Sequence, residues 1–226
     1  MDKFFKYALL FFALSILLSY GYVLYIAPSP VSIKKDRFTN HKDVLKDVNN
    51  GDLIFLSGDT HGERLCRWFS GCIFSHVGLM FVDDIDGEIY VLDSDLGQNM
   101  KDGVRIQKLT DKLRKYKGMK IGAIKRVKIN SSIPSSKFLE LIEKYKNVDF
   151  DDKMLTWFFG DISFMRNLFE NKKKMFCSEF VAECLEKLGI LSESSKKPSY
   201  YGPGDFYRTF KTKQDYTYEK PEFFRF

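Results

Sequence analysis

Cysteine and histidine are scarce in this sequence, which holds four cysteines and three histidines among its 226 residues. So few cysteines do not make the disulfide scaffold of a small secreted domain. Cys177 and Cys184 are two turns apart on a predicted helix, about 10 Å along its axis, which is too far for a disulfide. We therefore expect free thiols.

The sequence also lacks the features of a nucleic-acid-binding protein. It contains no helix-turn-helix, zinc-finger or RNA-binding motif, and no internal repeat or long low-complexity segment. Its net charge of +6 is too diffuse to indicate nucleic acid, although it suits an anionic membrane surface. We predict no nucleic-acid partner, and a chain of this length can bury one well-packed domain.

A long apolar run lies near the start of the sequence. Residues 7–26 carry no charge, and about 20 residues of helix span about 30 Å, the hydrocarbon thickness of a bilayer. Tyrosines at the outer end of the run suit the membrane interface. We predict a single-pass transmembrane helix at 7–26, after a short flank at 1–6. The alternative, a cleaved signal peptide, would have a shorter apolar core.

The rest of the chain divides into a polar linker at 27–50, a folded domain at 51–207 and a C-terminal tail at 208–226. Within the domain the predicted strands come early and the helices come late. Strands are expected at residues 53–56, 74–82, 89–92, 104–106 and 119–129, and helices at residues 65–69, 110–118, 135–145 and 177–188. This order predicts an α+β domain with an antiparallel sheet.

Residues 175–185 predict a helix that begins at a cysteine. An apolar stripe continues from Cys177 at helical spacing, and Gly189 supplies the end of the helix. A thiol at a helix N-terminus faces unpaired backbone N–H groups and the positive end of the helix dipole, which favour the thiolate. Cys177 is therefore a candidate nucleophile. The alternative is that Cys177 is only the first buried residue of the stripe.

His76 is the histidine best placed to act as a base. It lies in the predicted strand at 74–82, where period-two alternation sets it on the face opposite Val77, Leu79 and Phe81. A cysteine nucleophile needs a base, and histidine titrates near neutral pH. The other two histidines lie in the linker and in a glycine-bounded loop.

A third group should hold the imidazole by its other nitrogen. Asp93 ends the strand that follows the His76 strand in a predicted hairpin, so we expect it within reach. Asp95 shares its face and is the second choice. An ordinary turn aspartate is the alternative reading of each residue.

Four short motifs follow one another along the domain. They are Gly51-Asp52-Leu53-Ile54-Phe55, Arg67-Trp68-Phe69-Ser70-Gly71, Phe74-Ser75-His76-Val77-Gly78 and Phe176-Cys177-Ser178-Glu179-Phe180-Val181-Ala182. Together with the later Gly202-Pro203-Gly204-Asp205, they resemble the circularly permuted NlpC-type, papain-like superfamily. The resemblance is to its YiiX-like branch, with the lecithin:retinol acyltransferase-like proteins as more distant relatives. The order of His76 before Cys177 is that of the permuted branch.

The resemblance implies a papain-like fold in which the cysteine helix packs on the antiparallel sheet. It implies Cys177 as nucleophile, His76 as base and an acidic residue on the next strand as orienter, with the backbone N–H of Cys177 in an oxyanion hole. The YiiX-like pattern has glutamate at the third place, where this chain offers Asp93. We expect a membrane-anchored cysteine hydrolase or acyltransferase without metal or cofactor. Its target would be an amide, ester or thioester bond of a peptide, lipid or acylated substrate.

Other interpretations stay open. A binding or scaffold protein with little turnover could use the same fold at the membrane. The aromatic segment at 154–169 would line an acyl pocket, lie on the bilayer or fill the core. Zinc ligand types occur at His61, Cys66, Cys72 and His76, although no Cys-x-x-Cys spacing supports a zinc site.

Overall fold

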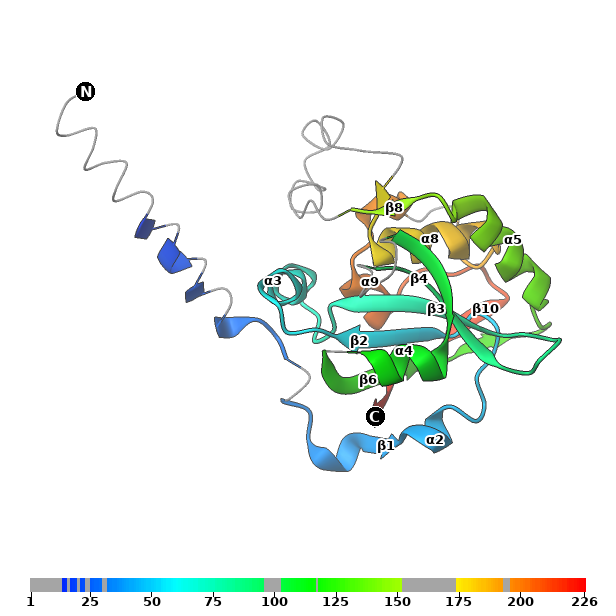
Figure 1. Cartoon of the computed structure of the whole chain (residues 1–226), viewed down its shortest axis with the longest axis horizontal. Coiled ribbons are helices and arrows are strands. Elements are labelled where there is room, and N and C mark those ends of the chain that lie inside the picture. Colours follow the sequence, from blue (N-terminus) through cyan, green and yellow to red (C-terminus); the bar gives the residue numbers. More distant parts are fainter. Residues whose placement is uncertain are drawn as a thin grey trace, which may run out of the picture.

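The structure of the protein is a computed structural model (Figure 1). It describes residues 14–15, 17–19, 21–22, 25–29, 32–95, 103–116, 118–151, 174–192 and 196–226. Its centre is a seven-stranded sheet with the strand order β1-β11-β6-β2-β3-β4-β5. All neighbouring strands in it are antiparallel except β1 and β11, which are parallel. The fold is therefore a mixed α and β fold with a mostly antiparallel sheet.

The strands of this sheet are β1 (Phe38–Asn40), β2 (Leu53–Ser57), β3 (His76–Val82), β4 (Ile89–Asp95), β5 (Gly103–Lys108), β6 (Met119–Lys125) and β11 (Glu222–Arg225). Smaller pairs join β7 (Val127–Ile129) to β10 (Tyr216–Tyr218) and β8 (Asp149–Phe150) to β9 (Lys174–Met175). The helices are η2 (Lys35–Arg37), α2 (His41–Val44), α3 (His61–Ser70), α4 (Leu109–Lys115), α5 (Ser135–Tyr145), α8 (Cys177–Lys187), η3 (Pro198–Tyr200) and α9 (Pro203–Tyr207).

Helices cover both faces of the sheet (Figure 1). On one face, Val77, Leu79 and Phe81 of β3 share a core with α5 and α8. On the other face, Met80 packs with residues of α2 and α4. The alternation of β3 is therefore as predicted, and it directs His76 towards the face that α4 covers.

The cysteine helix also begins and ends where its sequence predicts. Phe180, Val181, Cys184 and Leu185 of the apolar stripe are buried in the core shared with β3. After the C-cap residue Leu188, Gly189 adopts a left-handed φ of 73°. Glycine is common at this position because it has no side chain to strain a positive φ.

Two elements extend beyond their predicted bounds. The strand expected to end at residue 92 continues to Asp95, because β5 pairs with it through Asp93↔Arg105 and Asp95↔Gly103. The sheet also reaches past the predicted domain at 51–207. Linker residues form β1, and tail residues form β11, which pairs with β6.

Two predicted segments fall mainly on residues that the structure does not describe. These are the transmembrane helix at 7–26, which is described only in part, and the aromatic segment at 154–169. In the parts of the chain that are described, none of the helices has both the length and the apolar character needed to span a bilayer. The anchor stays a prediction from the sequence.

Candidate active site

Cys177 is the first residue of α8. The preceding residue, Phe176, is extended and provides no side-chain cap, so the first N–H groups of the helix have no such partner. The Cys177 side chain is buried, with 7% of its surface exposed. The thiol therefore lies at the positive end of the dipole of an 11-residue helix.

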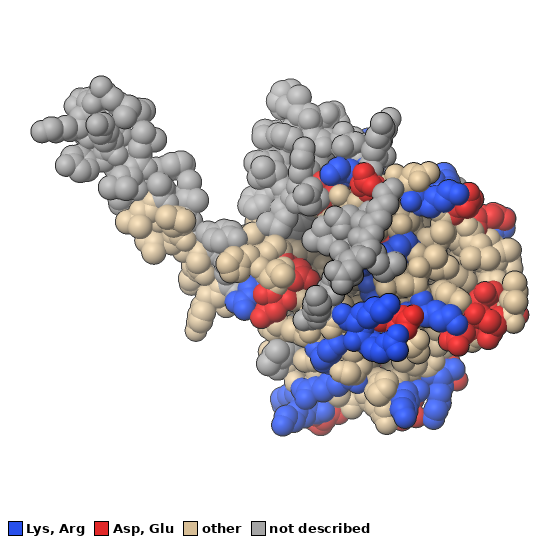
Figure 2. Space-filling model, viewed as in Figure 1, with Lys and Arg blue, Asp and Glu red and all other residues tan. Residues whose placement is uncertain are grey.

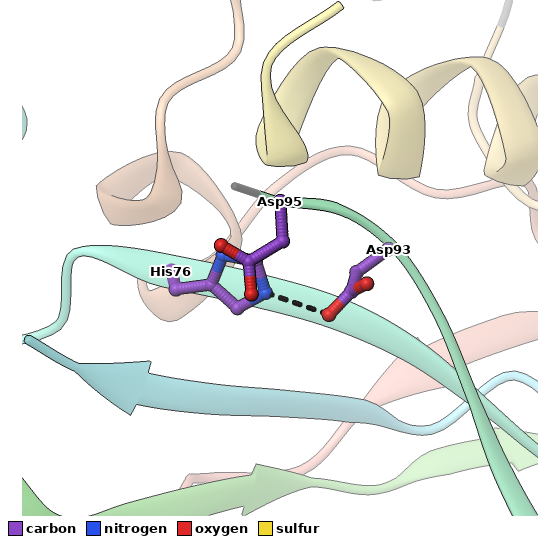
Figure 3. A group of neighbouring side chains, drawn as sticks. All are labelled: His76, Asp93 and Asp95. Atoms are coloured by element: carbon purple, nitrogen blue, oxygen red, sulfur yellow. Dashed lines mark hydrogen bonds and ion pairs between the residues drawn. The ribbon is translucent and has the colours of Figure 1, made fainter. Parts of the chain in front are cut away.

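The hairpin of β3 and β4 brings His76 beside Asp93 (Figure 3). His76 is the first residue of β3, and its ring Nε2 donates to Oδ2 of Asp93 at 2.9 Å. Both side chains are buried. Because Asp93 occupies Nε2, Nδ1 is the ring nitrogen that remains for a thiol. The contact expected from the hairpin is present, and Asp95 lies in the same group of side chains.

Two basic side chains neutralise these carboxylates. Lys112 of α4 bonds to Asp93 and, at 3.3 Å, to Asp95. Arg105 of β5 lies 3.4 Å from Asp93 and 2.7 Å from Asp95. We call His76, Asp93, Asp95, Arg105 and Lys112 the charge cluster. The pairs of Asp93 with His76 and Lys112 are shielded from water, which strengthens their electrostatic attraction.

The charge cluster shifts the pKa values of its members. Burial alone would lower the pKa of His76, but the Asp95 carboxylate, the Cys177 thiol and the bond to Asp93 raise it to about 10, against a partial offset from Lys112. Burial alone would raise the pKa of Asp93, but Lys112 and His76 hold it well below its usual range. Asp93 therefore stays ionised, and His76 is strongly favoured as the imidazolium.

The cysteine helix packs against both strands of this hairpin. Ser94 of β4 donates to the carbonyl of Met175 at 2.8 Å, which ties the strand to the residues just before Cys177. The thiol makes no hydrogen bond with His76, although both residues are described, but its influence on the pKa of His76 places the two groups within electrostatic reach.

The sequence carried a signal for Lys112 that our reading missed. Leu109, Lys112 and Leu113 are at helical spacing, so the lysine occupies a position on the apolar stripe of α4. A lysine in such a position is almost never fully buried unless it is paired. For Arg105, which alternates with apolar neighbours on β5, the signal is weaker.

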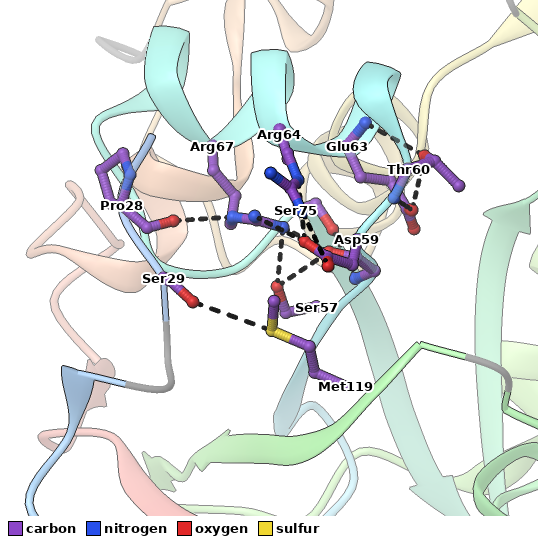
Figure 4. Close-up of polar contacts among 11 residues, drawn as sticks. Pro28, Ser29, Ser57, Asp59, Thr60, Glu63, Arg64, Arg67, Ser75 and Met119 are labelled. Carbon is purple, nitrogen blue, oxygen red and sulfur yellow. Dashed lines mark hydrogen bonds and ion pairs between the residues drawn. The ribbon is translucent and has the colours of Figure 1, made fainter. Parts of the chain in front are cut away.

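A second buried polar network borders the site (Figure 4). Arg67 of α3, only 2% exposed, donates to the carbonyl of Pro28 at 2.6 Å, to Ser57 Oγ at 3.2 Å and to the carbonyl of Gly58. The N–H of Gly58 in turn donates to Oγ of Ser75, the residue before His76. This network fixes the loop after β2 next to the charge cluster.

The zinc ligands considered from the sequence do not come together. Among the described residues, His76, Asp93 and Asp95 are the only three potential ligands whose donor atoms cluster. Both carboxylates already bond to Arg105 and Lys112. A divalent cation would have to displace or repel these two positive charges, so the group fits a metal poorly.

Comparison with known proteins places these residues in a family context. A model of the permuted papain-like amidase family (YaeF/YiiX, C92) matches residues 47–201, which include Cys177, His76 and Asp93. The uncharacterized protein R372 of Acanthamoeba polyphaga mimivirus is 26% identical over 212 residues, covering 79% of this chain and 83% of that protein. The crystal structure of metalloprotein yiiX from Escherichia coli O157:H7 aligns with 15% identity and a TM-score of 0.44, over 77% of this chain and 98% of that one.

Proposed function

Because the chain belongs to the permuted papain-like amidase family, we propose that it is a cysteine hydrolase in which Cys177 is the nucleophile, His76 the general base and acid, and Asp93 the orienting residue. The observation that carries this proposal is the 2.9 Å bond from His76 to the buried Asp93, on the hairpin against which the cysteine helix packs. It fixes the orientation of the ring and leaves Nδ1 as the nitrogen that does not bond to Asp93.

The reaction follows from these roles. The Cys177 thiolate attacks the carbonyl carbon of an amide, ester or thioester, and the carbonyl oxygen takes the negative charge. As the intermediate collapses, His76 gives its proton to the leaving amine, alcohol or thiol, and an acyl-cysteine remains. His76 then takes a proton from water, which attacks the acyl carbon and releases the acid and the free thiol. An alcohol or amine in place of that water would make the protein an acyltransferase.

The substrate we propose is a peptide, lipid or other acylated molecule at a membrane. The predicted helix at 7–26 would hold the domain at the bilayer. Basic side chains are abundant on the face in Figure 2, with acidic ones among them, which suits an anionic lipid surface. The first test needs no substrate, because it measures the reactivity of Cys177 itself.

The test is the rate at which iodoacetamide alkylates Cys177 across pH, in the wild type and in His76→Ala, followed by mass spectrometry of the labelled peptide. We expect rapid alkylation near neutral pH that slows at least about 10-fold in the variant, because the imidazolium stabilises the thiolate. The buried Cys184 of the same helix is an internal control and should react slowly in both proteins. Slow alkylation of Cys177 in both, rising only towards pH about 8.5, would instead favour a binding or scaffold protein.

A further inference from the structure

One buried polar atom near the charge cluster has no role in the fold. Tyr116 directly follows α4, and its hydroxyl is buried without a hydrogen-bond partner within the described chain. Native proteins satisfy nearly all buried polar groups, so each exception calls for an explanation. Packing explains the ring, which lies 6.1 Å from that of Phe226. Packing does not explain the hydroxyl, because phenylalanine would fill the same space.

The ring of Tyr116 lies at the end of the sheet where His76 begins β3. A side chain at Gly118 would come within 2.5 Å of this ring and 2.6 Å of the Ser57 carbonyl, so the ring and the end of β2 enclose Gly118. Ser57 follows Leu56, which is paired with His76. Tyr116 is also one helical turn beyond Lys112, the residue that reaches the two carboxylates.

Ionisable groups from other elements contribute to the electrostatic environment of the Tyr116 hydroxyl. Burial is the main cause that raises the pKa of Tyr116. Glu63 of α3, Asp95 of β4 and Cys177 of α8 raise this pKa further, and Arg67 offsets part of the increase. Groups of α3, β4 and α8 therefore act electrostatically on the hydroxyl. It also stays protonated at neutral pH, so it can donate a hydrogen bond.

We infer that the Tyr116 hydroxyl donates a hydrogen bond to the carbonyl oxygen of the acyl substrate and stabilises the oxyanion formed when Cys177 attacks. This inference rests on the proposed function. As the bond between sulfur and carbon forms, the C=O π bond breaks and its electron pair moves to the oxygen. A donor fixed in place before the reaction stabilises that charge without reorganisation. The same bond supplies the partner that the hydroxyl lacks in the free protein.

The experiment compares Tyr116→Phe with Tyr145→Phe in the full chain. The two variants remove the same atom, but the Tyr145 hydroxyl has a structural partner, Glu183, at 2.9 Å. The readouts are steady-state hydrolysis of p-nitrophenyl butyrate, alkylation of Cys177 by iodoacetamide, and Tm. For Tyr116→Phe we expect kcat to fall about 10²- to 10³-fold with little change in KM. Its alkylation rate should match the wild type, because alkylation forms no oxyanion.

Stability should move in the opposite direction to activity. Tyr116→Phe should keep or raise Tm, because it removes an unsatisfied buried hydroxyl. Tyr145→Phe should lower Tm by a few degrees and keep kcat, because it loses a hydrogen bond remote from the reaction.

The possible failures can be told apart. If Tyr116→Phe keeps its kcat, changes only KM, or slows alkylation and lowers Tm, the oxyanion role is overturned and the proposed function stands. If the wild type releases no nitrophenol, or if alkylation does not depend on His76, the proposed function fails and this inference fails with it.

Discussion

Lys112 and Lys125 are equally buried, each with 4% of its surface exposed, but they have opposite kinds of partner. Lys112 lies between two carboxylates in the charge cluster. Among the described residues, no carboxylate forms an ion pair with Lys125. Its ammonium donates to the carbonyls of Phe206 and Arg208 and lies 5.1 Å and 5.9 Å from the ring centres of Phe210 and Tyr218. We call this second region the lysine pocket.

The pKa values of the two lysines show what the partners do. Burial lowers the pKa of both, but Asp93 and Asp95 raise that of Lys112 above its ordinary value, whereas nothing prevents that of Lys125 from falling to about 8. Lys125 thus binds the C-terminal segment through carbonyl groups and aromatic rings, and these partners allow it to lose its proton. In the charge cluster, by contrast, the carboxylates favour the protonated form of Lys112.

This set of charges suits the proposed chemistry. In the charge cluster, Asp93 and Asp95 balance Arg105 and Lys112, so the protonated His76 adds one unbalanced positive charge. A Cys177 thiolate would neutralise it. The cluster therefore provides the positive charge that the proposed reaction uses, whereas the lysine pocket has no such relation to a reactive group.

Among the variants of the two regions, Asp93→Asn should cause the largest loss of activity. It removes the charge that holds the imidazolium, so we expect kcat for ester hydrolysis to fall about 10²- to 10⁴-fold. The pKa of His76 should fall, so the alkaline limb of the pH profile should move to lower pH. Asp86→Asn, a substitution in the turn of the same hairpin, is the matched control and should leave both unchanged. Full activity with an unmoved alkaline limb would show that Asp93 is only structural.

Lys112→Met should act mainly on stability. It leaves the buried Asp93 and the partly exposed Asp95 short of one cation, which costs about 3–5 kcal/mol of unfolding free energy. The alkaline limb should move to higher pH, because Lys112 lowers the pKa of His76. Urea unfolding at pH 7 and the pH profile of hydrolysis measure the two effects. Lys125→Met is the control, since it leaves no carboxylate without its partner. Equal losses of unfolding free energy in the two variants would show that the carboxylate partners of Lys112 make no difference to stability.

The elements that carry the site could be predicted because their signals are local. An apolar stripe and a terminal glycine defined the helix from Cys177, and period-two alternation placed His76 and Asp93 on one hairpin. The partners of Asp93 depend on contacts between distant segments. Lys112 reaches it only because α4 packs across β4 and β5, an arrangement that the spacing of α4 does not encode.

The boundaries of the domain could not be predicted either, because they also depend on contacts between distant segments. Residues Glu222–Arg225 form β11 because β6 offers them a partner, not because of a strong alternation of their own. The buried Tyr116 hydroxyl gives no sequence signal either, because a tyrosine at the end of an amphipathic helix is ordinary.

Lys125→Met should have the smallest effect at pH 7 and a distinct effect above it. Burial lowers the pKa of Lys125 to about 8 in the folded protein, from 10.5 for an ordinary lysine in the unfolded chain. Between these values the unfolded chain retains a proton that the folded protein has lost, so wild-type stability gains with rising pH, by at most about 1.4 kcal/mol per pH unit. The variant should lose this gain, which urea unfolding at pH 7, 8, 9 and 10 would detect.

His76 gives the free energy of unfolding the opposite dependence on pH, and this difference makes the test specific. Its pKa is raised from 6.5 to about 10, so its stabilisation is complete below pH about 6.5 and is lost as pH rises towards 10. The two slopes oppose each other between pH about 8 and 10. Lys125→Met should therefore lose stability faster than the wild type in this range, and His76→Gln should lose it more slowly. Parallel curves for all three proteins would mean that neither region titrates as its partners require.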